Sequence, residues 1–248
     1  MTNLDEYIIG IPVYDGVDLM DVAAPFEFFN WMAEIEPAVI PGARKRVVKL
    51  VSVDGPSVKT RDGLSLGSDL AGLDDAGAFD LLWVPGGDPD RLQELMLDTV
   101  FMNFLRRQSE TAQYTTSVCE GALLLAAAGL LNGYKATTHW AFIACLKLFP
   151  DIDVAAGYPR YVIDRDRVTG GGISSGMDEA LAIIALISND IVARKVQLSV
   201  QYNPRPPFND GDPSVATPPI YTPGEDSACS IPGMPDTIRA VLGGCHGG

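Results

Sequence analysis

Cysteine and histidine are scarce in this chain of 248 residues, which contains only four cysteines and two histidines. Structural zinc sites are usually built from closely spaced pairs of these two residue types. No two cysteines form a C-x-x-C pair, and the two histidines lie far apart in the sequence. These scarce residues are Cys119, Cys145, Cys229, Cys245, His139 and His246. The spacing therefore predicts no zinc site.

Positive charge is also in short supply. Lysine and arginine together number 18 against 32 aspartates and glutamates, which gives a formal net charge of −14. A nucleic acid or an anionic membrane would require a basic face. The composition therefore argues against both partners, and solubility is the simplest reading of the acidic excess.

Long apolar runs and a leader are likewise missing from the sequence. No apolar run reaches the ~20 residues that a membrane-spanning helix requires. The stretch Met1–Glu6 has neither the basic nor the apolar region of a secretory signal peptide. We therefore expect a cytoplasmic protein in a reducing compartment, with Cys119 free.

The chain does contain the pattern of a buried parallel sheet. Tyr7–Tyr14 and Phe79–Val84 are nearly continuous apolar runs, which is typical of strands covered on both faces. A length of 248 residues with 47% hydrophobic side chains suits one large α/β domain, or at most two small ones. Further strands are predicted over 46–53, 152–155, 161–164 and 168–169, with a hairpin after residue 54. Helices are predicted over about 20–32, 92–113, 122–131, 139–149, 177–187 and 190–202.

One stretch predicts a nucleophile. A β-rich run, Tyr114–Val118, ends at Cys119, and Gly121 opens a run of small residues and leucines typical of a buried helix. A strand-to-helix turn with the nucleophile at its apex is the elbow of α/β hydrolytic enzymes, and a helix N-terminus favours the thiolate. The alternative is a cysteine that only packs in the core.

Two other stretches follow predicted strands and are expected at the same edge of the sheet. Asp21 follows the first strand, and Pro85-Gly86-Gly87 follows the strand that ends at Val84. Ligands of open α/β sheets bind at the carboxyl ends of the strands. Adjacent glycines can also present N–H groups to an oxyanion. A carboxylate that complements a helix dipole and a plain turn are the alternatives.

His139 and Ser174 have weaker claims to a catalytic role. His139 could act as a base for Cys119, but no third residue is evident to orient it, so a backbone hydrogen bond at a helix start is favoured. The stretch Gly172–Gly176 fits G-x-S-x-G with Ser174 as nucleophile, a short pattern of low specificity. It lacks the third glycine of a phosphate loop.

The end of the chain differs in composition from the rest. Nine of the 18 prolines lie in the last 46 residues, so little regular structure is expected there. We predict one domain over residues 1–213 and a tail over 214–248 that is extended or partly disordered.

The Ser117-Val118-Cys119 elbow, the Pro85-Gly86-Gly87 loop and the acid after the first strand together resemble the DJ-1/PfpI superfamily. Three further stretches, Gly129–Trp140, Val168–Gly176 and Val196–Asn209, are similar to its isocyanide (isonitrile) hydratase branch. The resemblance runs from about residue 7 to 213. It implies a flavodoxin-like three-layer α/β/α sandwich with a mostly parallel sheet, a homodimer, no metal and no cofactor. Related transcription regulators add a C-terminal helix-turn-helix domain, which this tail does not resemble.

The same resemblance implies roles for five residues. Cys119 falls on the nucleophile and Asp21 on the acid, in Asp21-Val-Ala-Ala-Pro where relatives usually have Asp-x-x-Gly-Pro. The N–H groups of Gly87 and Glu120 fall on oxyanion-type donors, and Ile173 falls in the pocket. One position departs from the hydratases, which carry threonine where this chain has Glu120. That carboxylate could repel a thiolate, share a proton with Asp21 or point away from the site.

The implied reaction converts an isocyanide and water to an N-substituted formamide. Cys119 would form a thioimidate, with Asp21 as general acid and then general base. Two alternatives stay open: a cysteine-dependent hydrolase of amides or thioesters that uses Cys119 and His139, and a non-catalytic dimer that senses redox state or a small molecule.

Overall fold

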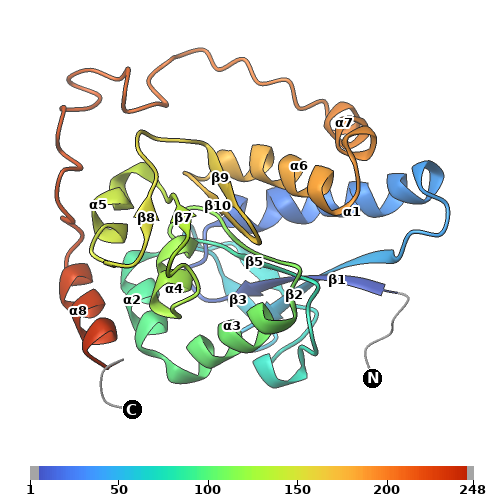
Figure 1. Cartoon of the computed structure of the whole chain (residues 1–248), viewed down its shortest axis with the longest axis horizontal. Coiled ribbons are helices and arrows are strands. Elements are labelled where there is room, and N and C mark those ends of the chain that lie inside the picture. Colours follow the sequence, from blue (N-terminus) through green and yellow to red (C-terminus); the bar gives the residue numbers. More distant parts are fainter. Residues whose placement is uncertain (1–5, 245–248) are drawn as a thin grey trace.

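The computed structural model describes residues 6–244, and Figure 1 shows a central sheet with helices on both faces. Six strands lie in the order β2-β1-β5-β6-β10-β9. All neighbours pair parallel except β9, which runs antiparallel to β10. The strand bounds are Glu6–Val13 (β1), Lys45–Ser52 (β2), Leu81–Val84 (β5), Tyr114–Ser117 (β6), Tyr161–Asp164 (β9) and Arg167–Gly170 (β10). The mostly parallel sheet agrees with the prediction.

Two groups of helices cover the sheet and complete a three-layer α/β/α sandwich. Helices α1, α6 and α7 pack against one another on one side, and α2, α3 and α4 on the other. Their bounds are Leu19–Val39 (α1), Pro89–Leu97 (α2), Thr99–Thr111 (α3), Gly121–Ala127 (α4), Ser175–Ile187 (α6) and Asp190–Ser199 (α7). Small hairpin strands, Ser57–Lys59 (β3) and Ser65–Gly67 (β4), form the predicted excursion, and Lys135–Ala136 (β7) pairs with Asp153–Val154 (β8).

Helix α1 is longer than the sequence predicts, because it continues through Pro37 to Val39. Pro25 also lies inside it and cannot donate a hydrogen bond to the carbonyl of Asp21, four residues earlier. The indole N–H of Trp83 donates to that carbonyl instead, at 2.9 Å. The strand β5 thereby satisfies the backbone group that the proline leaves free, and it anchors the start of α1 beside the site.

Two predicted helices are broken in the structure. The helix predicted over 92–113 is divided at Asp98, whose side chain accepts the N–H groups of Val100 and Phe101 and so caps α3. The helix predicted over 139–149 is a 3₁₀ turn, Trp140–Phe142, followed by the short α5, Ile143–Leu146. A side chain that caps a backbone N–H ends one helix and starts the next, which apolar periodicity does not reveal.

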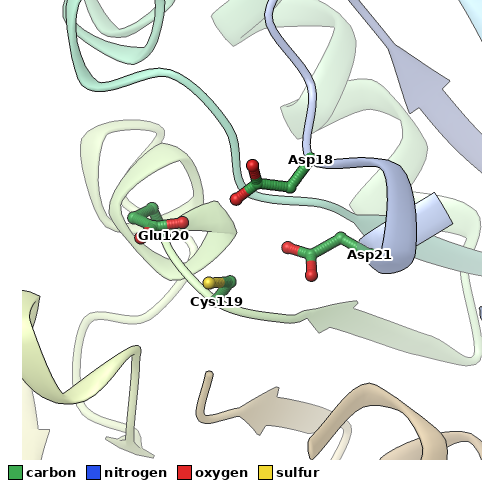
Figure 2. A group of neighbouring side chains, drawn as sticks. All are labelled: Asp18, Asp21, Cys119 and Glu120. Carbon is green, nitrogen blue, oxygen red and sulfur yellow. The ribbon is translucent and has the colours of Figure 1, made fainter. Parts of the chain in front are cut away.

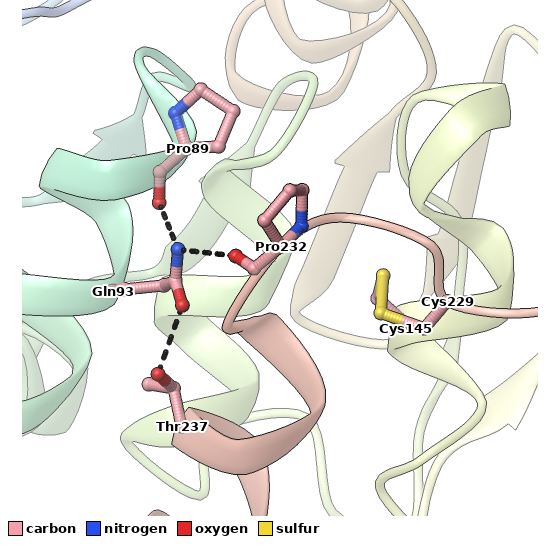
Figure 3. The surroundings of a disulfide bond; sticks show 6 residues. All are labelled: Pro89, Gln93, Cys145, Cys229, Pro232 and Thr237. Carbon is pink, nitrogen blue, oxygen red and sulfur yellow. Dashed lines mark hydrogen bonds between the residues drawn. A yellow bond between two sulfur atoms is a disulfide. The ribbon is translucent and has the colours of Figure 1, made fainter.

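The prediction of an extended or disordered tail is wrong over Met234–Gly244, which forms helix α8. Figure 1 shows the chain passing around the domain after α7, and α8 packs against α2 and α4. In Figure 3 the side chain of Gln93 donates to the carbonyl of Pro232 and accepts from Thr237, at 3.1 and 3.0 Å. The division of the chain at residue 213 stays a prediction.

A disulfide between Cys145 and Cys229 fastens the tail to α5 (Figure 3). Disulfides persist mainly in oxidising compartments, so this bond disagrees with the expected reducing environment. Cys119 is free, as predicted. Cys245 and His246 lie outside the described residues. Within residues 6–244, no helix combines the length and apolarity needed to cross a bilayer.

Candidate active site

Cys119 occupies a strained turn between β6 and α4. Its φ of 55° lies in the left-handed region, which residues other than glycine rarely adopt. Neighbouring segments hold the turn: the N–H of Cys119 donates to the carbonyl of Gly171, and the hydroxyl of Thr138 donates to the carbonyl of Cys119, each at 2.8 Å. At Gly121 a Cβ would lie 2.1 Å from the carbonyl oxygen of Val84, so only glycine fits there. The predicted elbow is present.

Four side chains converge at this elbow: Asp18, Asp21, Cys119 and Glu120. One ligand-type atom from each lies within 4.8 Å of the others, and Figure 2 shows the side chains pointing toward one another. All four residues are buried, with between 0% and 5% of their surface exposed. We call this group the acidic cluster. The carboxyl ends of β1 and β6 lie at one edge of a parallel sheet, and they place the start of α1 beside the elbow.

The acidic cluster contains more hydrogen-bond acceptors than the described residues satisfy. The N–H of Gly86 donates to Asp21 Oδ2 at 2.9 Å. No described residue donates to Asp18 Oδ2, Asp21 Oδ1 or Glu120 Oε2. Buried polar atoms normally have partners, and a carboxylate oxygen without one is costly.

A single arginine approaches the acidic cluster among the described residues. Arg61 Nη1 lies 3.7 Å from Asp18 Oδ1, and the Arg61 side chain is 48% exposed. Asp18 occupies the N-cap position of α1, yet its side chain makes no capping bond. Aspartate at that position normally accepts a backbone N–H and stabilises the helix. Its carboxylate instead faces Asp21 and Glu120.

The surroundings raise the pKa values of the acidic cluster. Burial, followed by the charge of Glu120, raises the pKa of Asp21 well above its usual range. Burial likewise raises the pKa of Glu120 to about 7, although contact with Cys119 opposes the shift. Burial, and then the charges of Glu120 and Asp21, raise the pKa of the Cys119 thiol. The helix N-terminus favours a thiolate, but the neighbouring acids and the lack of solvent favour the thiol, which is one of the effects expected of the carboxylate at Glu120.

Glu120 therefore faces the site, which removes the possibility that it points away. Its side chain lies beside Cys119 and is only 4% exposed as a residue (Figure 2). Contact between the Glu120 carboxylate and its own backbone N–H lowers the pKa of that carboxyl against the effect of burial. The same N–H is the one that the family resemblance implies as an oxyanion donor, so the side chain competes with that role.

Gly87 lies beside the site, but its neighbour Gly86 contacts Asp21 directly. Gly87 faces Val17 across a short antiparallel bridge, and a Cβ at Gly87 would lie 2.6 Å from the carbonyl oxygen of Gly16. Glycine is needed there for the close approach of two backbones. The structure therefore explains both glycines of the loop by packing and by the hydrogen bond to Asp21.

Ile173 lines a cavity of about 640 Å³ next to the elbow. Its walls include Trp140, Tyr158 and Phe208, and also Gly171 and Thr138, which bind the backbone of Cys119. Cys119, Asp21 and Glu120 do not line this cavity. The cavity therefore adjoins the backbone of Cys119, and the thiol is not part of its lining.

His139 and Ser174 make structural contacts. His139 Nδ1 accepts the N–H of Ala141 at 3.3 Å at the start of the 3₁₀ turn, which is the backbone contact that the sequence favours. Burial, and then the charge of Arg61, lower the pKa of His139 to about 4. Ser174 precedes α6, and its carbonyl accepts a hydrogen bond from Arg160 at 2.8 Å. Neither residue belongs to the acidic cluster.

Sequence reasoning missed Asp18, Arg61 and Glu179. Asp18 lies three residues before Asp21, a spacing that places both on one side of a helix start. Glu179 is fully buried on α6, and no described residue donates to either of its carboxylate oxygens. The charge of Asp21 adds to burial in raising the pKa of Glu179. A glutamate among the alanines, leucines and isoleucines of α6 was the available signal.

Comparisons with known proteins identify the family of the chain. The DJ-1/PfpI family model matches residues 9–186. An isonitrile hydratase from Pseudomonas putida is 35% identical over 208 residues, which cover 84% of each chain. The transcriptional regulator GbdR from Pseudomonas aeruginosa is 36% identical over 183 residues, which cover 73% of this chain but only 47% of the regulator.

Solved structures show the same fold. A ThiJ/PfpI family protein from Pseudomonas syringae has a TM-score of 0.80 at 30% identity, and the match covers 96% of this chain and 91% of the other. DJ-1beta from Drosophila melanogaster has a TM-score of 0.68 at 16% identity, and covers 79% and 98%. The second likeness concerns the fold alone.

Proposed function

The chain belongs to the DJ-1/PfpI family, and we propose that it is an isocyanide hydratase-like enzyme with Cys119 as nucleophile and Asp21 as general acid and base. One observation carries the proposal: the thiol of a positive-φ elbow and the carboxyl of Asp21 face each other inside a buried cluster. The identity with an isonitrile hydratase over most of both chains supports the choice of substrate.

The first step joins the sulfur of Cys119 to the terminal carbon of the isocyanide, R–N≡C. The thiol gives its proton to a carboxylate of the acidic cluster, and Asp21 delivers one proton to the carbon. The product is a thioimidate, R–N=CH–S–Cys119, and the number of protons on the cluster is unchanged. Glu120 lies against the thiol and is placed to take its proton.

In the second step, Asp21 removes a proton from water, and the oxygen attacks the thioimidate carbon. Asp21 passes that proton to the imine nitrogen, which gives the tetrahedral adduct R–NH–CH(OH)–S–Cys119. Collapse of the adduct breaks the C–S bond, its hydroxyl proton passes through a carboxylate of the acidic cluster to the Cys119 sulfur, and the N-substituted formamide R–NH–CHO leaves. A buried carboxyl can act in both directions because its pKa is raised toward neutrality.

The cavity beside Cys119 supports an apolar R group. Its lining includes Trp140, Tyr158, Phe208 and Ile173. With the R group bound in this cavity, only the linear N≡C end of the substrate has to reach the thiol. Because Cys119 is only 1% exposed and does not line the cavity, residues beside the thiol must shift for the carbon to approach. A narrow, linear terminus requires the smallest such movement.

The test is a time course of formamide production from an aryl isocyanide by the full chain. Cys119→Ala and Asp21→Asn should each lose at least about a hundredfold in kcat, since each removes a group that contacts the reacting carbon. Asp190→Asn, which alters an exposed aspartate on α7, should keep wild-type turnover. Full activity of Cys119→Ala would exclude the covalent scheme.

A small-molecule-sensing dimer is the second candidate, because GbdR shares similar identity over its matched region. Saturable binding of an isocyanide without formamide production would favour that function. The cysteine-dependent hydrolase is less well supported, since Nδ1 of His139 is engaged by a backbone N–H. The expected homodimer and cytoplasmic location stay proposals; light scattering on the purified chain tests the first, and fractionation of the source cells tests the second.

A further inference from the structure

We propose that the acidic cluster binds one divalent transition-metal ion of the Zn²⁺ or Co²⁺ class. Three carboxylates and one thiol supply four ligand atoms that lie within 4.8 Å of one another. Ligands of a tetrahedral Zn²⁺ ion lie at about 2.0–2.3 Å from the metal, and therefore roughly 3.3–3.8 Å apart. Binding would therefore require side-chain rotations that bring the four atoms closer together, and the side chains already point toward one another (Figure 2).

The unpartnered oxygens give the second argument. Asp18 Oδ2, Asp21 Oδ1 and Glu120 Oε2 are buried, and no described residue donates to them. The N–H of Gly86 donates to the other oxygen of Asp21 and fixes the orientation of the carboxyl group. Oδ1 is then directed into the acidic cluster. Hydrogen bonds to a ligand's second atom are the usual way in which proteins orient metal ligands.

Asp18 strengthens the case, because an aspartate at its position would ordinarily cap the helix. It stands at the N-cap of α1 but does not accept a backbone N–H there. The lost capping bond is worth about 1 kcal/mol to a typical helix. A shared cation would explain why the Asp18 carboxylate faces two other buried acids instead of making this capping bond.

Charge balance leads to the same conclusion. Arg61 is the one cation near the acidic cluster among residues 6–244, and it approaches Asp18 only to 3.7 Å. Buried carboxyl groups are normally protonated, paired with a cation or bound to a metal, and an ion at this cluster would replace the protons. The donor set of carboxylate oxygens and one sulfur suits a borderline ion such as Zn²⁺ or Co²⁺. Mg²⁺ and Ca²⁺ prefer oxygen alone.

The position of Arg61 indicates a path by which the ion would enter the acidic cluster. Its side chain is 48% exposed and lies at the outer side of Asp18. Displacement of this flexible side chain into solvent opens the acidic cluster without moving the sheet. On binding, the Cys119 sulfur becomes coordinated and its proton passes to solvent.

This inference goes beyond the proposed function and does not rest on it. The metal-bound form has Cys119 and Asp21 occupied, so it cannot form the thioimidate, and the ion would inhibit hydratase turnover. Binding and turnover are separate measurements: an ion that binds a protein without hydratase activity would leave this inference intact while the proposed function failed.

The experiment is calorimetric titration of the chelator-treated full chain with Zn²⁺, with the Cys145–Cys229 disulfide intact. We expect one ion per chain. Asp18→Asn should lower the affinity at least tenfold, because it removes one anionic ligand and leaves the other three in place. Asp190→Asn, which alters an exposed aspartate on α7, should bind as wild type.

Co²⁺ gives an independent readout of the sulfur ligand. A thiolate-to-cobalt charge-transfer band in the near ultraviolet is expected for wild type and for Asp190→Asn, and its loss is expected in Cys119→Ala. Circular dichroism verifies that each variant is folded. The inference is overturned if wild type takes up no stoichiometric Zn²⁺, or if Asp18→Asn and Cys119→Ala bind it as tightly as wild type.

Discussion

The two ends of helix α1 carry two buried carboxyl groups in opposite surroundings. Glu36, near the end of the helix, receives two hydrogen bonds from Arg46, at 2.6 and 2.8 Å, and is 1% exposed. Arg46 also donates to the carbonyl of Ile187. Asp21, in the first turn, is fully buried and receives one backbone N–H, with no arginine or lysine beside it among the described residues.

The difference is reflected in the pKa values. Burial alone would raise the pKa of Glu36, but the hydrogen bonds and charge of Arg46 outweigh it and lower the pKa. At Asp21 burial and the charge of Glu120 act together and raise the pKa. The Glu36 end is arranged for stability. The Asp21 end holds acids together at a cost in stability, which is typical of functional sites.

The largest expected effect comes from removing the partner at the stable end. Glu36→Ala should lower the free energy of unfolding by about 3–5 kcal/mol, because it leaves Arg46 buried without its anion. Denaturant unfolding at neutral pH measures the change. The matched control is Glu34→Ala, an exposed glutamate on the same helix, which should stay within about 0.5 kcal/mol of wild type. Equal decreases in the free energy of unfolding of the two variants would show that the Glu36–Arg46 ion pair does not contribute to stability.

A smaller effect of opposite sign is expected from Glu179, which lies near Asp21. Glu179→Met replaces a carboxyl that has no described partner with an apolar side chain of similar size. At pH 8 we expect a gain of about 1–2 kcal/mol in the free energy of unfolding, since the cost of burying an unpaired polar group disappears. Thermal or denaturant unfolding checks it. A loss of stability would mean that Glu179 has a hydrogen-bonding partner in solution.

The pH dependence of these two glutamates sharpens the comparison. The pKa of Glu36 is lowered from 4.5, so its contribution is complete above that value and is lost as the pH falls through the folded pKa. The pKa of Glu179 is raised well above 4.5 by burial and Asp21, so stability falls as the pH rises from 4.5 toward the folded pKa.

Unfolding measured from pH 3 to pH 8 should therefore show two opposite trends. Glu36→Gln, whose side chain faces Arg46, should have a lower free energy of unfolding than wild type, and this difference should shrink toward acid pH. The gain of Glu179→Met, which faces Asp21, should grow toward alkaline pH. Each trend is expected to span on the order of 1 kcal/mol, and parallel curves for wild type and either variant would contradict the assigned surroundings.

Local sequence patterns predicted the parts of the molecule that depend on neighbouring residues. Apolar runs located β1 and β5, and the abrupt end of Tyr114–Val118 located the elbow at Cys119. The features that sequence reasoning missed depend on contacts between distant segments. The Trp83 indole satisfies the carbonyl that Pro25 leaves free, and the pairing of Cys145 with Cys229 joins residues 84 positions apart.

The same distinction applies to the site. Cys119 and Asp21 could be proposed from their places at strand ends, and the resemblance supplied their roles. Burial could not be predicted, so the part played by Asp18 was not foreseen, and a raised pKa of the Cys119 thiol was only one of the possible effects of Glu120. Aspartate before a helix is usually a cap, and only the tertiary structure shows that Asp18 faces the acidic cluster instead.

The measurement that tests the account most directly sets Asp21→Asn beside Glu36→Gln, two isosteric changes at opposite ends of one helix. For each, isocyanide turnover and the free energy of unfolding are measured on the same metal-free preparation. The account predicts that Asp21→Asn loses at least about a hundredfold in kcat with no loss of stability, while Glu36→Gln loses stability and keeps the turnover of its folded fraction. An Asp21→Asn variant that is less stable than wild type but still turns over the isocyanide at the wild-type rate would contradict it.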